Sequence, residues 1–439
     1  MSRSFLVWLL VAGLALWVHN RDRAWRALEV FEWDAGGYYT YLPSAFIYHD
    51  IGRADSLERL GDKFGPPKPR GIGIVTLPNG RVISKYPPGI ALGELPFFAG
   101  AHAFAKLMPR FPADGFSKPY QQAMLLAGLT YGILGLWIVR KLLLRFFDDR
   151  TTAWAVAGVG LGTNYFNYIT NDAAMSHGAL FMWQAALLYC TVRWYETFRP
   201  RWAVGMGFFL GVAVLCRFTE ALYIIIPLAW GITSWAALRQ RSGLLLAHWK
   251  QLTTAAAVGA AVVSLQFLFW RTVSGHWVVD SYGVEHFDFW HPHVLYGLFS
   301  YRKGWLLYTP LAGLMLLGLF AAWRRLPAVV VPTLVLLPVV LYVTFSWEAW
   351  WYGGGFSARP LVSLYPLLAL PFAALLAAAR RWAWAGRAVL HTAVVLCIVL
   401  NLWQTGQYAT GHLLYDKNTR ELYFSRFFES PHPFFDRFH

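Results

Sequence analysis

Asp34 is the first residue in the chain whose type and setting could do chemistry. It lies in FEWDAGGYYTYLPSAFIYHD at 31–50, beside Glu32 and ahead of two glycines and an aromatic run whose spacing suits an amphipathic helix on a bilayer surface. A carboxylate there could act as a general base, taking a proton from a hydroxyl or amine as it attacks a carbon atom opposite a leaving phosphate. Asp also commonly caps a helix N-terminus, so both interpretations of Asp34 stay open.

Lys85 is the second candidate, and it stands in SKYPPGIAL at 84–92, just before an apolar run. A lysine at the end of a segment often only extends its ammonium to the membrane interface. Here Pro87 and Pro88 fix the backbone and remove two N–H donors, so the lysine sits at a rigid position. A fixed ammonium can hold a phosphate, and Tyr86 beside it is a candidate substrate contact.

Two later stretches add cations ahead of apolar segments. FSYRKGWLLYTP at 299–310 places Arg302 and Lys303 before a glycine, where they could bind a phosphate at a helix N-terminus or anchor the chain at the interface. SWEAWWYGGGFSARPL at 346–361 has three glycines that allow close backbone approach to a ligand, and Arg359 would reach into that space. Its tryptophans could equally form an aromatic belt.

Further ionisable residues near or within apolar segments are candidate substrate contacts, because such residues are costly in a membrane. Arg217 and Glu220, three positions apart, could also simply pair with each other. The whole secondary set consists of Glu32, Tyr86, His177, Arg217, Glu220 and Glu348.

Composition indicates where these residues act. Hydrophobic residues make up 57% of the 439 positions and charged residues 14%, and the mean hydropathy is +0.41. This is the composition of a polytopic membrane protein. The net charge of +15 lies mainly in short clusters between apolar runs, which favours membrane topology and acidic lipid head groups over nucleic acid as a partner. Cys190, Cys216 and Cys397 show no paired spacing and are expected to pack in the core.

A spanning helix needs about 20 apolar residues, which predicts an all-α bundle of about 11 transmembrane helices (10–13). Residues 90–108 are interpreted as a partly inserted or interfacial helix, and whether they span stays open. The predicted spans are 5–18, 120–139, 151–169, 173–192, 202–216, 218–236, 251–270, 304–322, 327–345, 359–379 and 388–404.

Basic residues mark every second connection after residue 140 as cytoplasmic, for example Arg239, Arg241 and Lys250. We therefore expect a cytoplasmic N-terminus, with the connections at 20–89, 271–303 and 346–358 outside. In domain terms, 1–404 is one transmembrane unit, 20–119 is a long first outward loop with interfacial helices, and 405–439 is a short aromatic outward tail.

The ordered series of short motifs resembles the GT-C superfamily of membrane glycosyltransferases, near the protein O-mannosyltransferase and aminoarabinose transferase branch and uncharacterised Bacteroidetes-type members. The motifs that carry the resemblance are the acidic first loop, KYPPG, the late RKG…YTP and WWYGGGFSAR, together with DGFSKPYQQA and QTGQYATGHLLYDKNTRELYF. The resemblance covers nearly the whole chain, but no separate soluble domain follows the last span.

The resemblance implies a glycosyltransferase that moves a sugar from a polyprenyl-phosphate donor to a glycan, lipid or protein acceptor, with inversion. The site would face the periplasm or exterior of a bacterial inner membrane. Asp34 matches the catalytic carboxylate and Lys85 a lysine that contacts the donor phosphate, whereas Arg302, Lys303 and Arg359 match donor-phosphate contacts only by position and chemistry.

Metal dependence stays open, because Glu32 and Asp34 stand in place of a paired Asp-x-Asp, so a divalent metal is not supported by the motif. The alternatives are a transporter or lipid flippase, and a lipid-linked phosphotransferase. The sugar, the acceptor and the oligomeric state do not follow from the sequence.

Overall fold

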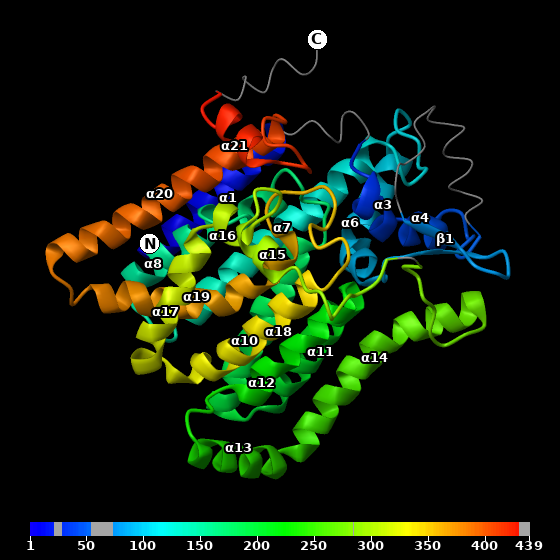
Figure 1. The fold of residues 1–439 in the computed structure, drawn as a ribbon. Coiled ribbons are helices and arrows are strands. Elements are labelled where there is room, and N and C mark those ends of the chain that lie inside the picture. Colours follow the sequence, from blue (N-terminus) through cyan, green and yellow to red (C-terminus); the bar gives the residue numbers. More distant parts are fainter. Residues whose placement is uncertain (22–28, 54–72, 284, 430–439) are drawn as a thin grey trace.

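The computed structural model describes residues 1–21, 29–53, 73–283 and 285–429. Arg23 and Arg26, much of the predicted first loop and residues 430–439 of the predicted tail lie outside these ranges. Within them nearly all regular structure is helical, and the one sheet is a short hairpin (Figure 1). The all-α prediction is confirmed.

The elements follow one another along the chain in this order. The first part contains α1 (Arg3–Arg21), α3 (Trp33–Tyr39), α4 (Tyr41–Phe46), β1 (Ile74–Thr76), β2 (Val82–Ser84), α6 (Gly89–Leu107), α7 (Lys118–Leu143), α8 (Asp149–Leu161), α9 (Tyr165–Ile169) and α10 (His177–Thr197). The middle contains α11 (Pro200–Cys216), η1 (Phe218–Ile224), α12 (Ile225–Ala229), α13 (Trp235–Ala247), α14 (Trp249–Ser274), α15 (Val294–Phe299) and α16 (Trp305–Tyr308). The last part contains α17 (Leu311–Arg325), η2 (Pro327–Val329), α18 (Val330–Phe345), η3 (Arg359–Leu364), α19 (Tyr365–Ala379), α20 (Trp384–Ala409) and α21 (Arg420–Arg426).

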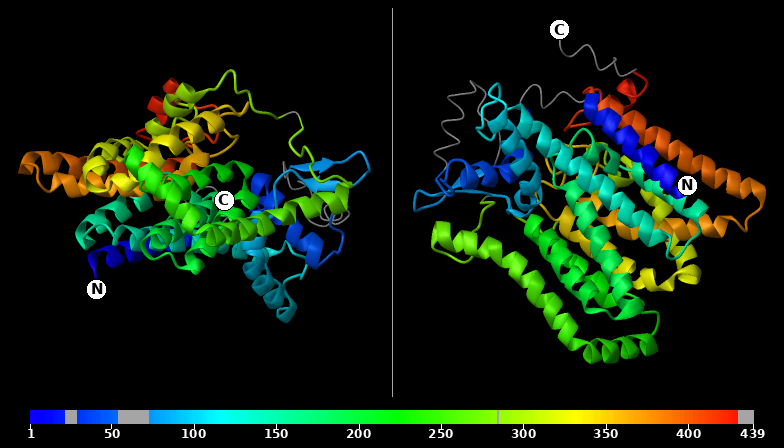
Figure 2. Two further views of the ribbon diagram at one scale, coloured as in Figure 1. Left: turned by 90° about the horizontal axis from the view of Figure 1, so that it is seen from below. Right: turned by 180° about the vertical axis from the view of Figure 1, so that it is seen from behind.

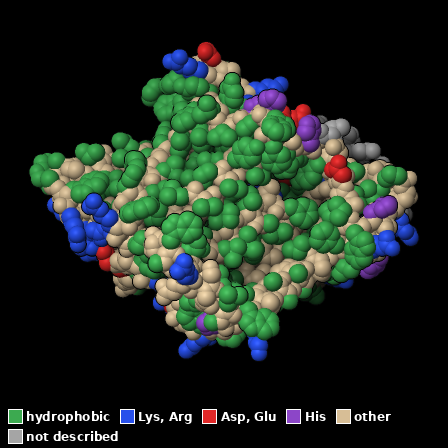
Figure 3. Space-filling model, turned by 60° about the horizontal axis from the view of Figure 1, so that its bottom comes forward, with side chains coloured by type: hydrophobic (Ala, Val, Ile, Leu, Met, Phe, Trp, Pro, Cys, Tyr) green, Lys and Arg blue, Asp and Glu red, His purple; other side chains and the backbone are tan. Residues whose placement is uncertain are grey.

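Six helices in the described ranges are long and apolar enough to cross a membrane. They are Arg3–Arg21, Lys118–Leu143, Trp249–Ser274, Pro327–Phe345, Arg359–Ala379 and Trp384–Ala409. Figure 3 shows a face covered by apolar side chains, with Lys and Arg gathered at its edges. An apolar face bordered by basic residues is typical of a polytopic membrane protein. The total of about 11 spans stays a prediction.

The core of the bundle is built around α19. In the most apolar 18 residues of η3 and α19 together, 89% of the residues are buried, whereas the corresponding shares for α14 and α20 are only 11% and 17%. Small residues let neighbouring helices approach α19, since a Cβ on Gly318 of α17 would lie 2.1 Å from the Pro371 carbonyl oxygen. Outer helices therefore face the lipid, and α19 is a rigid central support for the segment that precedes it.

Local sequence explains where several helices begin and end. Asp148 caps α8 by accepting hydrogen bonds from the backbone N–H groups of Arg150 and Thr151 at 3.0 Å each. Pro200 is the first residue of α11, where its missing N–H costs nothing. Gly275, with φ of +80°, ends α14 in a left-handed conformation.

Several predicted spans differ from the helices of the structure. The segment 218–236 is not one helix, because η1 and α12 end at Ala229 and α13 starts only after Ser234 caps it; Gly231 lies in the break with φ of +76°. The segment 151–169 is divided into α8 and α9 after Leu161, and the segment 304–322 is divided into α16 and α17 after Tyr308. Helix α6 covers Gly89–Leu107 without a break, and α20 extends beyond the predicted span 388–404 at both ends, from Trp384 to Ala409.

The described elements of the first loop gather at one end of the bundle. Both views in Figure 2, like Figure 1, place α3, α4 and the hairpin on that side. Strands β1 and β2 pair antiparallel, with Val75 opposite Ile83, and the Asn79 side chain donates to the Val273 carbonyl at 3.0 Å. The hairpin is thereby tied to the end of α14, and it leads directly into the KYPPG segment.

Candidate functional site

Asp34 lies in the first turn of α3 and contacts a residue from the far end of the sequence. One carboxylate oxygen accepts a hydrogen bond from the Tyr86 hydroxyl at 2.5 Å, and the other accepts from Arg359 Nη2 at 2.7 Å. The N-cap of α3 is Glu32, so the N-cap interpretation of Asp34 is wrong. The side chains of Asp34 and Arg359 are 21% and 12% exposed, which makes this a sheltered ion pair.

The surroundings keep Asp34 ionised. Burial alone would raise its pKa, but the charge of Arg359, the Tyr86 hydrogen bond and the charge of Lys85 together hold that pKa below its usual range. Burial also raises the pKa of Tyr86, so its hydroxyl stays protonated and donates to the carboxylate. The site therefore contains a carboxylate that is charged at neutral pH and is framed by donors.

Lys85 and Tyr86 are fixed by contacts on both sides of the KYPPG segment. The Tyr41 hydroxyl donates to the Tyr86 carbonyl at 2.6 Å, and the Ser281 hydroxyl donates to the Lys85 carbonyl at 2.9 Å. The Lys85 ammonium lies 3.3 Å from Glu285 and 5.2 Å and 5.4 Å from the ring centres of Tyr86 and Tyr282. The ammonium thus lies among aromatic rings at the start of α6, next to the Asp34 pair.

Arg217 approaches the same place from the end of α11. Its guanidinium donates to the Ser176 hydroxyl at 3.2 Å, and that hydroxyl is 3.5 Å from the hydroxyl of Tyr38 in α3. The ring of Tyr38 is centred 4.7 Å from that of Tyr86. Glu220 is only loosely paired with Arg217, at 3.9 Å, because its carboxylate accepts from Gln184 at 2.7 Å.

The glycine-rich segment before α19 brings Arg359 to Asp34. Tyr352, Gly353 and Ser357 have φ of +54°, +64° and +57°, which is unusual for the two residues that are not glycine. The Ser357 hydroxyl is buried and has no hydrogen-bond partner in the described structure. Such a backbone persists only when its surroundings hold it.

Arg302 and Lys303 lie on the other side of this segment and contact protein groups. Arg302 forms a two-point ion pair with Asp416, at 2.7 and 3.1 Å, and its guanidinium carbon lies 3.5 Å from the ring centre of Trp351. Lys303 is buried and donates to the carbonyls of Gly355 and Tyr415. Both residues therefore border the site next to the C-terminal segment.

The other predicted contacts are distributed as follows. His177 is buried at the start of α10 with its ring 4.6 Å from that of Tyr168, and Glu32 is half-buried at the start of α3. Glu348 is 60% exposed and lies 3.5 Å from His286. The described residues contain no group of three or more His, Cys, Asp or Glu side chains that could hold a metal ion.

Sequence reasoning missed residues that act through the backbone or from the tail. The Tyr168 hydroxyl both donates to the Phe356 carbonyl at 2.9 Å and accepts from the Phe356 N–H at 2.8 Å. Asp416 stands in LLYDKN, where only the pairing with Arg302 reveals its role. Asp416 lies in the motif QTGQYATGHLLYDKNTRELYF, and Tyr168 lies in TNYFNYITND at 163–172, but neither stretch indicates which distant segment its residue contacts.

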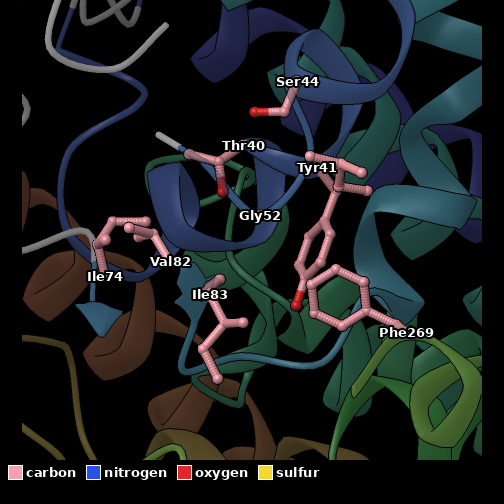
Figure 4. Close-up of a pocket in the computed structure, with 10 residues that line it drawn as sticks. Thr40, Tyr41, Ser44, Gly52, Ile74, Val82, Ile83 and Phe269 are labelled. Carbon is pink, nitrogen blue, oxygen red and sulfur yellow. The ribbon is translucent and has the colours of Figure 1, made fainter. Parts of the chain in front are cut away.

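A small pocket lies between α4, the hairpin and α14 (Figure 4). Its volume is about 30 Å³, enough for a water molecule but not for a sugar. The ring of Tyr41 lies beside that of Phe269, with the ring centres 5.3 Å apart. The Tyr41 hydroxyl already donates a hydrogen bond to the Tyr86 carbonyl. The pocket is lined by Thr40, Tyr41, Ser44, Ile51, Gly52, Ile74, Val82, Ile83, Ser84 and Phe269.

Comparison with known proteins gives distant structural matches. No protein-family model and no curated protein matches the chain. Among solved structures it is similar to ArnT from Cupriavidus metallidurans, with 15% identity and a TM-score of 0.44, covering 77% of this chain and 56% of that one. It is also similar to an oligosaccharyltransferase from Archaeoglobus fulgidus, with 12% identity and a TM-score of 0.43, covering 95% and 57%. The chain spans little more than half the length of either protein.

Proposed function

We propose that this protein is a membrane glycosyltransferase that moves a sugar from a polyprenyl-phosphate donor to a glycan, lipid or protein acceptor. The observation that carries the proposal is the Asp34–Arg359 pair. It joins an ionised carboxylate to a cation from a strained glycine-rich segment, with Tyr86 and Lys85 beside them. A base next to phosphate-binding cations is the set of groups that displacement of a phosphate from a sugar requires.

The reaction follows from these roles in a single displacement. The acceptor oxygen or nitrogen attacks the sugar carbon that carries the phosphate, and Asp34 takes the proton that the acceptor loses. The bond between that carbon and the phosphate oxygen breaks, and polyprenyl phosphate leaves with the electron pair. Attack from the face opposite the phosphate inverts the configuration at carbon.

In this scheme Arg359 can pair with either of two anions, the Asp34 carboxylate or the donor phosphate. In the structure it neutralises Asp34 at 2.7 Å, and a donor phosphate would offer a stronger, bidentate partner. When Arg359 turns to the phosphate, the carboxylate becomes free to accept the proton. Lys85 would hold the phosphate from the α6 side, and Arg217 is a third cation, linked through the Ser176 hydroxyl to Tyr38.

The position of the site suits a lipid donor. Lys85 stands at the start of the apolar helix α6, so a head group held there leaves a polyprenyl chain next to apolar surface. We place the site at the outer face of a bacterial inner membrane, because basic connections mark the opposite side as cytoplasmic. Arg359, Lys85 and Arg217 would contribute positive charge against the leaving phosphate, and metal dependence stays open.

Incubation of the purified protein with labelled polyprenyl-phosphate sugars and membrane extracts tests the proposal. We expect label to appear on an acceptor together with free polyprenyl phosphate in equal amounts. Release of polyprenyl phosphate without transfer to any acceptor would count against a transferase, and movement of intact lipid between leaflets would favour a flippase.

A further inference from the structure

The turn at 413–418 is pinned to the glycine-rich segment by the two adjacent cations Arg302 and Lys303. Arg302 donates to both carboxylate oxygens of Asp416, from Nε and from Nη2. This planar two-point geometry gives the strongest contacts between a guanidinium and a carboxylate. The charge of Arg302 and its hydrogen bond outweigh the effect of burial and lower the pKa of Asp416, so this carboxylate stays ionised. Within the turn, Asn418 bonds to both backbone groups of Leu414, at 3.1 and 2.8 Å.

Lys303 links the turn to the segment directly. Its ammonium donates to the carbonyls of Gly355 and Tyr415, and the Gly355 N–H also donates to the Tyr415 carbonyl at 3.1 Å. Leu413 packs with Phe356, Tyr308 and Tyr423 in one buried cluster. The turn therefore covers one side of residues 353–356 through polar and apolar contacts together.

Tyr168 holds the opposite side of the segment. Its hydroxyl bonds both backbone groups of Phe356, and a Cβ added to Gly355 would lie 3.0 Å from that hydroxyl and 3.3 Å from Arg359 Cδ. The segment is thus held between α9 and the C-terminal turn. Arg359 follows within a few residues, and its contact with Asp34 depends on where the segment lies.

We infer that the C-terminal turn 413–418 positions Arg359, and that Arg302 and Lys303 act through this turn and segment 353–359. They are then positioning residues, whereas Arg359 touches the donor phosphate. The part that concerns the phosphate depends on the proposed function; the mechanical part does not. The sequence pattern instead predicts Arg302 and Lys303 as direct contacts of the phosphate. Exchanging the charges of Arg302 and Asp416 distinguishes these two assignments.

Hydrogen exchange without substrate tests the mechanical part. Asp416→Asn should speed exchange of the backbone amides in 353–359 about tenfold, because Gly355 loses its support from Tyr415. Glu421→Gln, an exposed carboxylate on the neighbouring helix α21, is the matched control and should change nothing there. Unchanged hydrogen exchange of 353–359 in a folded Asp416→Asn protein overturns the inference. If Asp416→Asn is not recovered as a folded protein, Arg302→Gln supplies the same test.

Donor kinetics then separate positioning from direct contact. Arg302→Asp and Asp416→Arg should each raise the KM for the lipid donor about 5- to 10-fold with kcat within about twofold, and the double exchange should return KM to within about threefold of wild type. If Arg302 touches the phosphate, the double exchange stays as poor as Arg302→Asp, and the inference is overturned. If the wild type transfers no sugar at all, the proposed function is contradicted. The hydrogen-exchange experiment still decides whether the turn holds segment 353–359.

Discussion

At the scale of single residues, the proposed mechanism depends on the Asp34 carboxylate, whose partner Arg359 must be released before Asp34 can accept a proton. In Asp34→Asn the amide no longer competes for Arg359, so we expect binding of polyprenyl phosphate to tighten about 3- to 10-fold. Equilibrium binding of labelled lipid to the purified protein measures this change. The gain should vanish when Arg359→Gln is added to Asp34→Asn.

The control for this experiment is Glu421→Gln, which removes one negative charge far from the pair. A gain that persists without Arg359 would show a general effect of charge, and the proposed exchange of partners would then be wrong.

Lys303 gives a pH prediction with a definite sign. Burial lowers the pKa of Lys303 to about 7, whereas an unfolded lysine has a pKa of about 10.4. Between these values the unfolded chain binds a proton that the folded protein does not, so stability rises with pH across this window, and the penalty is fully present below about pH 7. Between pH 7 and 10 the melting temperature of the wild type should therefore rise with pH relative to that of Lys303→Gln. Parallel curves of melting temperature against pH would contradict the prediction.

At the scale of elements, close helix crossings depend on glycines that have no room for a side chain. A Cβ on Gly207 in α11 would lie 1.9 Å from the Ala255 carbonyl of α14, whereas a Cβ on Gly313 in α17 meets no atom within 4 Å. Gly207→Ala should destabilise the protein by about 1–3 kcal/mol, and Gly313→Ala should be neutral or slightly stabilising. Thermal unfolding in detergent compares them, and equal melting temperatures would show that α14 adjusts freely.

Sequence patterns predicted most elements because long apolar runs determine membrane helices, and α7, α14 and α20 lie where expected. They failed where apolar composition continues across a break, as at Gly231 in the predicted span 218–236. Residue type and neighbourhood singled out Asp34, Lys85 and Arg359 as candidates, and the structure brings them together, whereas their roles stay predictions. The use of Tyr168 and Asp416 was not predictable, because backbone hydrogen bonds and ion pairs between distant segments leave no local pattern.

At the scale of the whole molecule, the site requires the first loop and the later loops to share one side of the membrane. The contact between Asn79 and Val273 already ties the hairpin to the end of α14, and this helix of 26 residues is about 39 Å long, enough to cross a bilayer. Single cysteines at Thr76 and His276 should therefore react together with an impermeant thiol reagent on intact cells. Ser242→Cys, in α13 at the other end of α14, should react only after permeabilisation.

These variants require a background in which the three native cysteines are replaced. Labelling of Thr76→Cys and Ser242→Cys from the same side would place Asp34 on the wrong face and contradict the proposed orientation.

The most direct test of the account is sugar transfer by Asp34→Asn in proteoliposomes that contain labelled polyprenyl-phosphate sugar and face a membrane-extract acceptor. Loss of the base should slow transfer about 100-fold or more, while lipid binding does not weaken and Glu421→Gln behaves as wild type. Transfer by Asp34→Asn at a rate near that of wild type would contradict the account.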